Sequence, residues 1–277
     1  MTATSELTLG HIAYLNCVPF FGRLRESGFQ GHFVSGVPSA LNRMLQEKIL
    51  DASPSSSFEY ASHWRDYLLL PGHSIASVEE VRSVALFSPV DPKELEGQDV
   101  FLTGESATSV NLLRILFREF YGLHDVRDKV PEGPVEALIE AGKPALLIGD
   151  RALKLANNLP AGVYFYDLGK LWYEQTGLPF VFALWMVRRN SLEPFRSQLK
   201  ALGGQLQQSR DEVLKQPGSF AVQASAETGL PEDVIIDYWK TIDYRLDEPH
   251  LCGLKLFFQL CNKHQLLEDV PELNFLT

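Results

Sequence analysis

The sequence contains few cysteines, and they are widely spaced: Cys17, Cys252 and Cys261 among 277 residues. A disulfide framework needs more cysteines at closer spacing. The first residues, Met-Thr-Ala-Thr-Ser-Glu-Leu-Thr-Leu, also lack the basic start and apolar core of a signal peptide. Together these absences favour a cytoplasmic protein.

Long apolar runs and an excess of basic residues are missing as well. No apolar stretch approaches the roughly 20 residues that a membrane-spanning helix needs. The formal net charge is −10 and the pI is about 5.2, which disfavours nucleic acids and anionic membrane surfaces as partners. A small anionic ligand is still compatible with this charge, because backbone N–H groups can oppose the overall sign locally.

The common cofactor and metal motifs are absent. The chain has no Gly-x-Gly-x-x-Gly, no phosphate-binding loop ending in Gly-Lys-Ser/Thr, no His-Glu-x-x-His and no paired Cys-x-x-Cys units. Its seven histidines occur singly, without the spacing of metal ligands. The segment around Ser106 lacks the final glycine of a hydrolase nucleophile elbow. We therefore expect no metal and no dinucleotide or other cofactor.

Short apolar runs alternate with amphipathic segments through the first two thirds of the chain. This alternation predicts an α/β protein with largely parallel strands. A hydrophobic content of 45% is enough to form a substantial core. Strands are expected near residues 7–14, 32–35, 49–52, 81–88, 100–102, 145–148, 163–166 and 180–187, and Phe182 and Trp185 are expected in the core.

The order of these segments predicts two lobes. Residues 1–88 and 188–277 would form lobe 1, and residues 89–187 would form an inserted lobe 2. The strands near 83–88 and 182–187 would cross between the lobes, and the chain after Asn190 turns helical. Ligands of such folds bind at the carboxyl ends of strands, so we expect a ligand cleft between the lobes.

A hydroxyl-rich turn, Thr103–Ser109, follows the apolar run that ends at Leu102. A helix that begins at such a turn has unpaired N–H groups and a partial positive charge. Three hydroxyls beside those groups, from Ser106, Thr108 and Ser109, would suit a small anion without any lysine. Ordinary capping of the helix is the alternative interpretation.

Two further polar positions fall at strand ends in the first lobe. Asn16 occupies the first strand-to-helix turn, where its amide could both donate to and accept from a substrate. Alternatively, Asn16 caps the helix that Pro19 begins. The run Ser55–Ser57 precedes another predicted helix, and Ser56 is a candidate hydrogen-bond donor, although simple capping is equally compatible.

Three more candidates belong to the crossing strand and the inserted lobe. Ser83 enters an apolar strand, where it could face either a cleft or the surface. Gly149 would allow close approach of the backbone to a ligand, and Asp150 would begin a helix. Asp at a helix start is more often structural than functional.

Taken in order, four motifs resemble the chorismate dehydratases of the futalosine route to menaquinone. They are Tyr-Leu-Asn-Cys-Val-Pro at 14–19, Ser-Ala-Thr-Ser-Val at 106–110, Ile-Gly-Asp-Arg-Ala-Leu at 148–153, and Trp-Tyr-Glu-Gln-Thr-Gly-Leu-Pro-Phe-Val-Phe-Ala at 172–183. The resemblance covers residues 7–265. It implies a cytoplasmic enzyme with the two-lobed fold of type II periplasmic binding proteins, whose mixed sheets are flanked by helices. It departs at Glu105 and at Ala107, where an arginine is common in that family.

The resemblance also implies the reaction, which is loss of water from chorismate to give 3-[(1-carboxyvinyl)oxy]benzoate. Asn16 would contact the reacting centre, and Ser106, Thr108 and Ser109 would bind carboxylate. An amide is not a useful base, so the substrate's enolpyruvyl carboxylate would take the proton while Asn16 orients it. Asp150 or Glu105 acting as the base is the rival hypothesis.

Two other functions remain open at this point. The sister family of 1,4-dihydroxy-6-naphthoate synthases shares the fold, but a Cys-Pro-Asn-Asp-like string is expected at its first turn. A non-catalytic binder of aromatic carboxylates is equally compatible with such a fold, because fold does not settle function. For the dehydratase the partner would be the small molecule chorismate, and the two other functions also imply a small-molecule partner.

Overall fold

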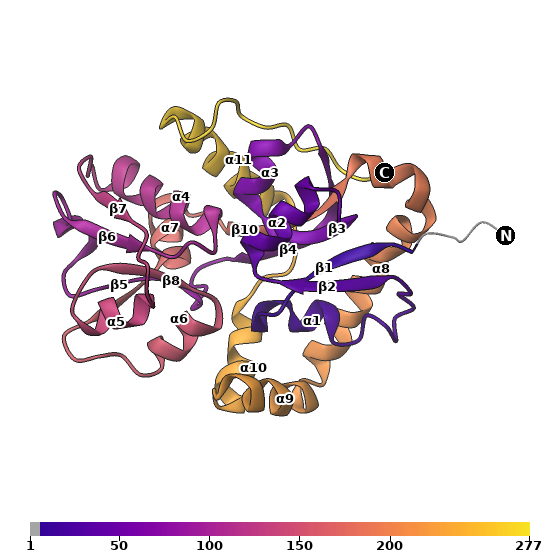
Figure 1. The fold of residues 1–277 in the computed structure, drawn as a ribbon, viewed down its shortest axis with the longest axis horizontal. Coiled ribbons are helices and arrows are strands. Elements are labelled where there is room, and N and C mark those ends of the chain that lie inside the picture. The colour runs from indigo at the N-terminus through magenta and orange to yellow at the C-terminus, as the bar shows by residue number, and fades with distance from the viewer. Residues whose placement is uncertain (1–5) are drawn as a thin grey trace. The chain divides into compact units, whose positions relative to one another are not determined.

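The computed structural model describes residues 6–277, which divide into two units by their internal contacts (Figure 1). Unit 1 holds the chain up to Ile75, together with Ala183–Asp247 and Pro271–Thr277. Unit 2 holds Ala76–Phe182 and Glu248–Val270. Each unit contains one five-stranded sheet with helices around it, which confirms the α/β class.

The sheet of unit 1 has the strand order β2-β1-β3-β10-β4. Its strands are β1 (Thr8–Ile12), β2 (His32–Gly36), β3 (Ala52–Ser56), β4 (Tyr67–Ser77) and β10 (Phe180–Arg188). Strand β1 runs parallel to β2 and β3, whereas β10 is antiparallel to β3. The sheet is therefore mixed, because the chain returns from unit 2 through β10 and enters the sheet from the opposite direction.

In the part of unit 1 that the structure describes, six α-helices accompany this sheet: α1 (Val18–Phe21), α2 (Pro38–Gln46), α3 (Ser57–His63), α8 (Leu192–Lys215), α9 (Gly218–Thr228) and α10 (Glu232–Thr241). Helix α1 packs against α8 and brings aromatic rings onto the sheet. The ring of Phe20 meets that of Trp185 edge to face, with 5.5 Å between their centroids. Trp185 is 1% exposed and Phe182 is 8% exposed, so both expected core residues are buried.

Two strands of unit 1 depart from the sequence expectations. Strand β3 lies later in the chain than the strand expected over residues 49–52, so Ser55 and Ser56 end a strand and α3 begins at Ser57. Strand β4 has no counterpart among the expected strands. Its middle residues, Pro71 and Gly72, are exposed between two buried stretches, and this pair hid the strand pattern.

The sheet of unit 2 has the strand order β7-β6-β8-β5-β9. Its strands are β5 (Val84–Ser88), β6 (Asp99–Leu102), β7 (Arg127–Lys129), β8 (Ala145–Ile148) and β9 (Tyr164–Asp167). Strand β6 is parallel to β7 and β8, whereas β5 is antiparallel to β8 and β9. This sheet is also mixed rather than largely parallel.

Five α-helices belong to unit 2: α4 (Ala107–Ile115), α5 (Val135–Glu140), α6 (Gly149–Ala156), α7 (Leu168–Thr176) and α11 (Glu248–Lys263). Short helical turns complete the chain at η1 (Leu15–Cys17), η2 (Pro92–Glu94), η3 (Leu116–Phe120, a π-helix) and η4 (Arg189–Ser191). Within the described part of the chain, no helix is both long and apolar enough to cross a lipid bilayer.

Helix α11 packs into the core of unit 2, far from its sequence neighbours. The ring of Phe257 lies 5.0 Å from that of Phe180 and 6.3 Å from that of Trp172, by their centroids. Gly253 fits against the backbone so closely that a Cβ there would lie 2.0 Å from the carbonyl oxygen of Pro179. The units therefore place β5 and α11 in unit 2, where the expected lobe ranges put them in lobe 1.

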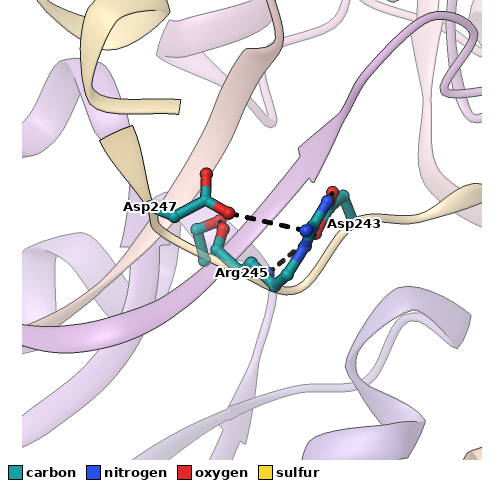
Figure 2. A network of polar contacts seen from close by, with 4 residues as sticks. Asp243, Arg245 and Asp247 are labelled. Atoms are coloured by element: carbon teal, nitrogen blue, oxygen red, sulfur yellow. Dashed lines mark hydrogen bonds and ion pairs between the residues drawn. The ribbon is translucent and has the colours of Figure 1, made fainter. Parts of the chain in front are cut away.

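Residues 243–247 end the second segment of unit 1 in a polar network (Figure 2). The guanidinium of Arg245 pairs with both carboxylate oxygens of Asp243 and lies 3.5 Å from Oδ2 of Asp247. The hydroxyl of Ser74, on β4, donates to the carbonyl of Arg245, and the Ser74 N–H donates to the carbonyl of Tyr244 at 3.0 Å. These contacts fix the segment, and Tyr244 with it, against β4.

Candidate functional site

The candidate residues of unit 2 lie at one edge of its sheet. Because β6 and β8 are parallel neighbours, the turns that follow Leu102 and Ile148 lie at the same edge. Strand β5 is antiparallel to β8 and pairs Val84 with Ile148, so the residue before Val84 lies there too. The structure therefore brings together Ser83, the turn with Ser106, Thr108 and Ser109, and the pair Gly149 and Asp150.

The hydroxyl of Ser106 caps helix α4, which was the alternative to an anion site in the sequence analysis. Its Oγ accepts the backbone N–H of Ser109 at 3.2 Å and lies 3.0 Å from the Ser109 Oγ. Thr108 is 0% and Ser109 2% exposed. Capping does not exclude an anion, because one cap satisfies only one of the first N–H groups of the helix. The turn is thus pre-organised, with its hydroxyls held close to the start of α4.

An ion-pair network joins the starts of α4 and α6. Arg151 on α6 lies 3.1 Å from Oε1 of Glu105, in the turn before α4. The same guanidinium donates to both carboxylate oxygens of Glu136, at 2.7 and 2.6 Å. The hydrogen bond from Arg151 lowers the pKa of Glu136. The carboxylate of Glu105 is consequently engaged by a cation on its own sheet edge.

The turn before β5 is held by a carboxylate that sequence reasoning missed. Asp167, at the end of β9, is 6% exposed and accepts the N–H groups of Val81, Arg82 and Lys170. Burial raises the pKa of Asp167, while these backbone donors oppose the shift. The arrangement fixes Arg82 at φ +62° and directs Ser83 into the sheet edge, where its carbonyl accepts the N–H of Gly149 at 2.7 Å.

Gly149 begins helix α6 in a left-handed backbone conformation, with φ +68°. A residue with a Cβ adopts that conformation at a cost of about 1 kcal/mol, so glycine is favoured there. Asp150 follows in the first turn of α6, where the helix dipole favours a carboxylate. No side chain caps this helix start.

In unit 1, Asn16 lies in the η1 turn that follows β1. It caps neither η1 nor α1, whose N-cap residues are Tyr14 and Cys17, so the capping interpretation of Asn16 is wrong. Its Oδ1 is buried and has no hydrogen-bond partner among the described residues. The turn itself is anchored, because Nε1 of Trp239 donates to the carbonyl of Leu15 at 2.7 Å. A buried amide oxygen without a partner suits an incoming donor.

Ser56 reaches the same edge of the unit 1 sheet as Asn16, since β1 and β3 are parallel. Its hydroxyl accepts the N–H of Glu59 at 3.3 Å and caps α3. The neighbouring Ser55 is different, because its Oγ is buried without a partner among the described residues. Ser55 is thus a stronger candidate than Ser56 for a hydrogen bond to a substrate. The two serines differ in this way because β3 ends at Ser56.

Between residues 6 and 277, no group of three or more His, Cys, Asp or Glu side chains is positioned to hold a metal ion. The unit 2 edge holds the Glu105–Arg151 ion pair and Asp150, and the neutral polar groups at the two sheet edges are hydroxyls, an amide and backbone N–H groups. Such donors bind and orient an anionic or hydroxylated organic molecule.

Comparison with known proteins identifies relatives along nearly the whole chain. A family profile described as Menaquinone biosynthesis matches residues 7–263. A chorismate dehydratase from Thermus thermophilus is 36% identical over 263 residues, covering 90% of this chain and 93% of that protein. A chorismate dehydratase from Campylobacter jejuni is 31% identical over 183 residues, covering 64% and 66%.

Solved structures show the same fold at low sequence identity. A protein from Archaeoglobus fulgidus superposes with a TM-score of 0.75 at 18% identity, covering 95% of this chain and 99% of that one. The alkanesulfonate-binding protein SsuA from Xanthomonas axonopodis pv. citri, bound to MOPS, gives 0.72 at 14% identity, covering 99% and 98%. The chain therefore has a periplasmic-binding-protein-like fold.

Proposed function

The chain belongs to the menaquinone biosynthesis family, and we propose that it is a chorismate dehydratase, a hydro-lyase that forms 3-[(1-carboxyvinyl)oxy]benzoate and water. The observation that carries the proposal is the 36% identity to the Thermus thermophilus chorismate dehydratase over 90% of this chain. We place the reaction in the cytoplasm and in the futalosine route, with chorismate as the small-molecule partner.

The protein can catalyse this reaction by orienting the substrate and stabilising charge. A C–H bond breaks at the ring carbon that bears the enol ether, and the C–O bond to the neighbouring hydroxyl breaks. The electron pair of the first bond becomes a ring double bond, and the proton and hydroxide leave as water. Because aromatisation drives the step, the site must hold the ring, bind two carboxylates and exclude competing reactions.

The unpartnered oxygen of Asn16 supports its assignment to the reacting centre. Its Oδ1 could accept a hydrogen bond from the O–H of the departing hydroxyl, and its Nδ2 could donate to the enolpyruvyl carboxylate. An amide has no useful affinity for protons, so that carboxylate of the substrate takes the ring proton while Asn16 orients it. In this assignment Asn16 is the catalytic residue, with Ser56 and the neighbouring Ser55 as further donors.

The edge of the unit 2 sheet suits a carboxylate of the substrate. Ser106, Thr108, Ser109 and the first N–H groups of α4 are the donors, and Ser83 lies beside them. Gly149 and Asp150 complete the edge. The network of Glu105, Glu136 and Arg151 has a net charge of −1 and Asp150 adds another negative charge, so any substrate carboxylate would be held by the hydroxyls and backbone N–H groups rather than by a free cation. This arrangement accommodates Ala107, where an arginine was expected from the resemblance.

The decisive assay incubates the purified chain with chorismate and follows the products by liquid chromatography with mass detection. Formation of 3-[(1-carboxyvinyl)oxy]benzoate is the expected result. Chorismate that is bound but returned unchanged would overturn the proposal in favour of a non-catalytic binder. Inert chorismate, together with turnover towards 1,4-dihydroxy-6-naphthoate from that enzyme's own substrate, would assign the chain to the sister activity instead.

A further inference from the structure

A cavity in unit 1 has no role in the proposed reaction. It encloses about 360 Å³ between the ends of α2 and α3, the start of β4 and the end of β10. Basic side chains dominate its lining, which includes Lys48, His63, Arg65, Arg188 and Arg189, against the single acid Asp66. A basic cavity is unexpected in a chain whose formal net charge is −10.

Two of these cations are already neutralised. Arg188 donates through Nε to the carbonyl of Leu50 at 2.8 Å, and its guanidinium lies 3.5 Å from Oδ1 of Asp51. His63 lies 2.9 Å from Oε1 of Glu59, and that hydrogen bond raises the pKa of His63. Neither residue therefore leaves a charge for a ligand.

Two of the remaining cations have no acid as a partner. Among residues 6–277, neither Lys48 nor Arg189 has an ion-pair or side-chain hydrogen-bond partner, whereas Arg65 is engaged, with its guanidinium over the Trp64 ring at 4.4 Å. In the lining of the cavity, the two positive charges of Lys48 and Arg189 thus face one negative charge, that of Asp66. A nearby helix end explains Lys48 in part, because cations are favoured after a helix C-terminus. Arg189 follows a strand, so this explanation does not extend to it.

The cavity lies at the opposite end of β3 from the candidate substrate residues. Strand β10 pairs Val187 with Ala52 at one end of β3 and Ala183 with Ser56 at the other. Arg188 and Arg189 follow Val187, whereas Asn16 and Ser56 lie at the carboxyl ends of β1 and β3. The two ends, Ala52 and Ser56, are four steps apart along the strand, which is about 13 Å. A ligand in the cavity would therefore not occupy the substrate site.

We propose that this cavity is a binding site for a compact organic polyanion, one that carries a phosphate group or several carboxylates, with Lys48 and Arg189 as its principal contacts. Its volume is within the range of small-molecule sites. A guanidinium matches the geometry of both carboxylate and phosphate oxygens, and a lysine adds a point charge.

Calorimetric titration of the full chain with pyrophosphate and, separately, with citrate tests the proposal. Saturable binding of at least one of them is expected, and which one binds identifies phosphate or carboxylate as the recognised group. Lys48→Gln with Arg189→Gln should weaken binding at least tenfold and leave turnover of chorismate unchanged. The matched control, Lys200→Gln with Lys215→Gln, removes two exposed positive charges from α8 of the same unit and should bind as the wild type does.

Three outcomes would overturn the proposal. The wild type could bind neither probe, or both double variants could lose affinity equally. The heat could also be reproduced by sodium chloride at matched ionic strength, which would indicate general screening of charge rather than a site. Each is distinct from failure of the dehydratase assay, which uses another ligand and other residues.

Discussion

Arg151 engages Glu105 across 46 positions of sequence, with 3.1 Å between the guanidinium and Oε1 of the carboxylate. The pair connects the turn before α4 to the first turn of α6, the two helix starts proposed to meet the substrate carboxylate. Arg151 also binds Glu136 through two hydrogen bonds. Glu105 therefore has a structural role at this sheet edge. An ion-paired structural carboxylate is a poor candidate for the base that removes the ring proton.

Glu105→Gln should leave catalysis nearly intact. A partly exposed ion pair contributes about 0–1 kcal/mol, so kcat should fall by no more than about fivefold. A true general base contributes about 10²–10⁴-fold. Asp150→Asn should likewise keep most of the activity. Steady-state kinetics with chorismate, together with a binding measurement for each variant, provide the check. Loss of turnover to background in either variant, with chorismate still bound, would assign the base to that residue.

Asn16→Ala should separate activity from stability. We expect kcat to fall by about 10²-fold or more, because the residue that orients the reacting group is lost. The free energy of unfolding should change by less than about 1 kcal/mol, since Oδ1 has no partner to lose within the described protein. Urea denaturation and turnover are measured on the same preparation.

Asn42→Ala is the matched control for Asn16. The Oδ1 of Asn42 is also buried without a partner in the described chain, but Asn42 lies on α2. Its substitution should leave kcat unchanged. Equal losses of activity in the two variants would mean that Asn16 acts only through the fold of unit 1.

The sequence predicted where most candidate residues lie in the two sheets, because these polar residues follow recognisable strands. Asn16, Ser106 and Gly149 each come within a few residues of the end of an apolar run, and parallel strands place such turns at one edge of a sheet. The sequence could not distinguish Ser55 from Ser56. Ser56 caps α3 and the Ser55 hydroxyl has no partner within residues 6–277, but a strand that ended a few residues earlier or later would reverse these two roles. The pairing of Glu105 with Arg151 depends on strand order, which no local pattern encodes.

The fold, like the candidate site, could be predicted only in part from the sequence. The alternation of strands and helices was sufficient for the α/β class, but β4 was missed because Pro71 and Gly72 divide its apolar residues. The direction of β5 and β10 was missed for a different reason. Periodicity reports which face of a strand is buried and carries no information on which way the strand runs in a sheet. His73, within β4, escaped notice together with its strand.

His73 should make the protein less stable in mild acid. The side chain is 5% exposed, and burial lowers the pKa of His73 to about 4, with Arg210 adding to the shift. In the unfolded chain the pKa is about 6.5, so the unfolded state binds the proton first as the pH falls. The stability that neutral His73 contributes is complete above pH 6.5 and is lost between about pH 6.5 and 4. The loss is about 2 kcal/mol at pH 5 and about 3 kcal/mol in full.

The measurement is the free energy of unfolding at pH 7 and pH 5 for the wild type and for His73→Gln. The difference between the two proteins isolates His73 from other titrating groups. That matters because His63, whose pKa is raised by Glu59, acts with the opposite sign. The wild type should lose about 2 kcal/mol more than the variant on going to pH 5. Identical losses in the two proteins would show that His73 is protonated alike in the folded and unfolded states.

Tyr244→Phe should not destabilise the protein, although Tyr244 is 4% exposed. Its hydroxyl is buried without a partner in the described chain, and burial raises the pKa of Tyr244 well above its ordinary value. Removing an unsatisfied buried hydroxyl should be neutral or stabilise by up to about 1 kcal/mol.

Tyr60→Phe is the contrasting variant, because the Tyr60 hydroxyl donates to the carbonyl of Glu272 at 2.7 Å and accepts the N–H of Asn274 at 2.9 Å. Its loss should cost about 1–3 kcal/mol in urea denaturation, since two backbone groups lose their partner. A comparable cost for Tyr244→Phe would mean that its hydroxyl has a partner in solution, such as an ordered water held beside His73 and Phe20.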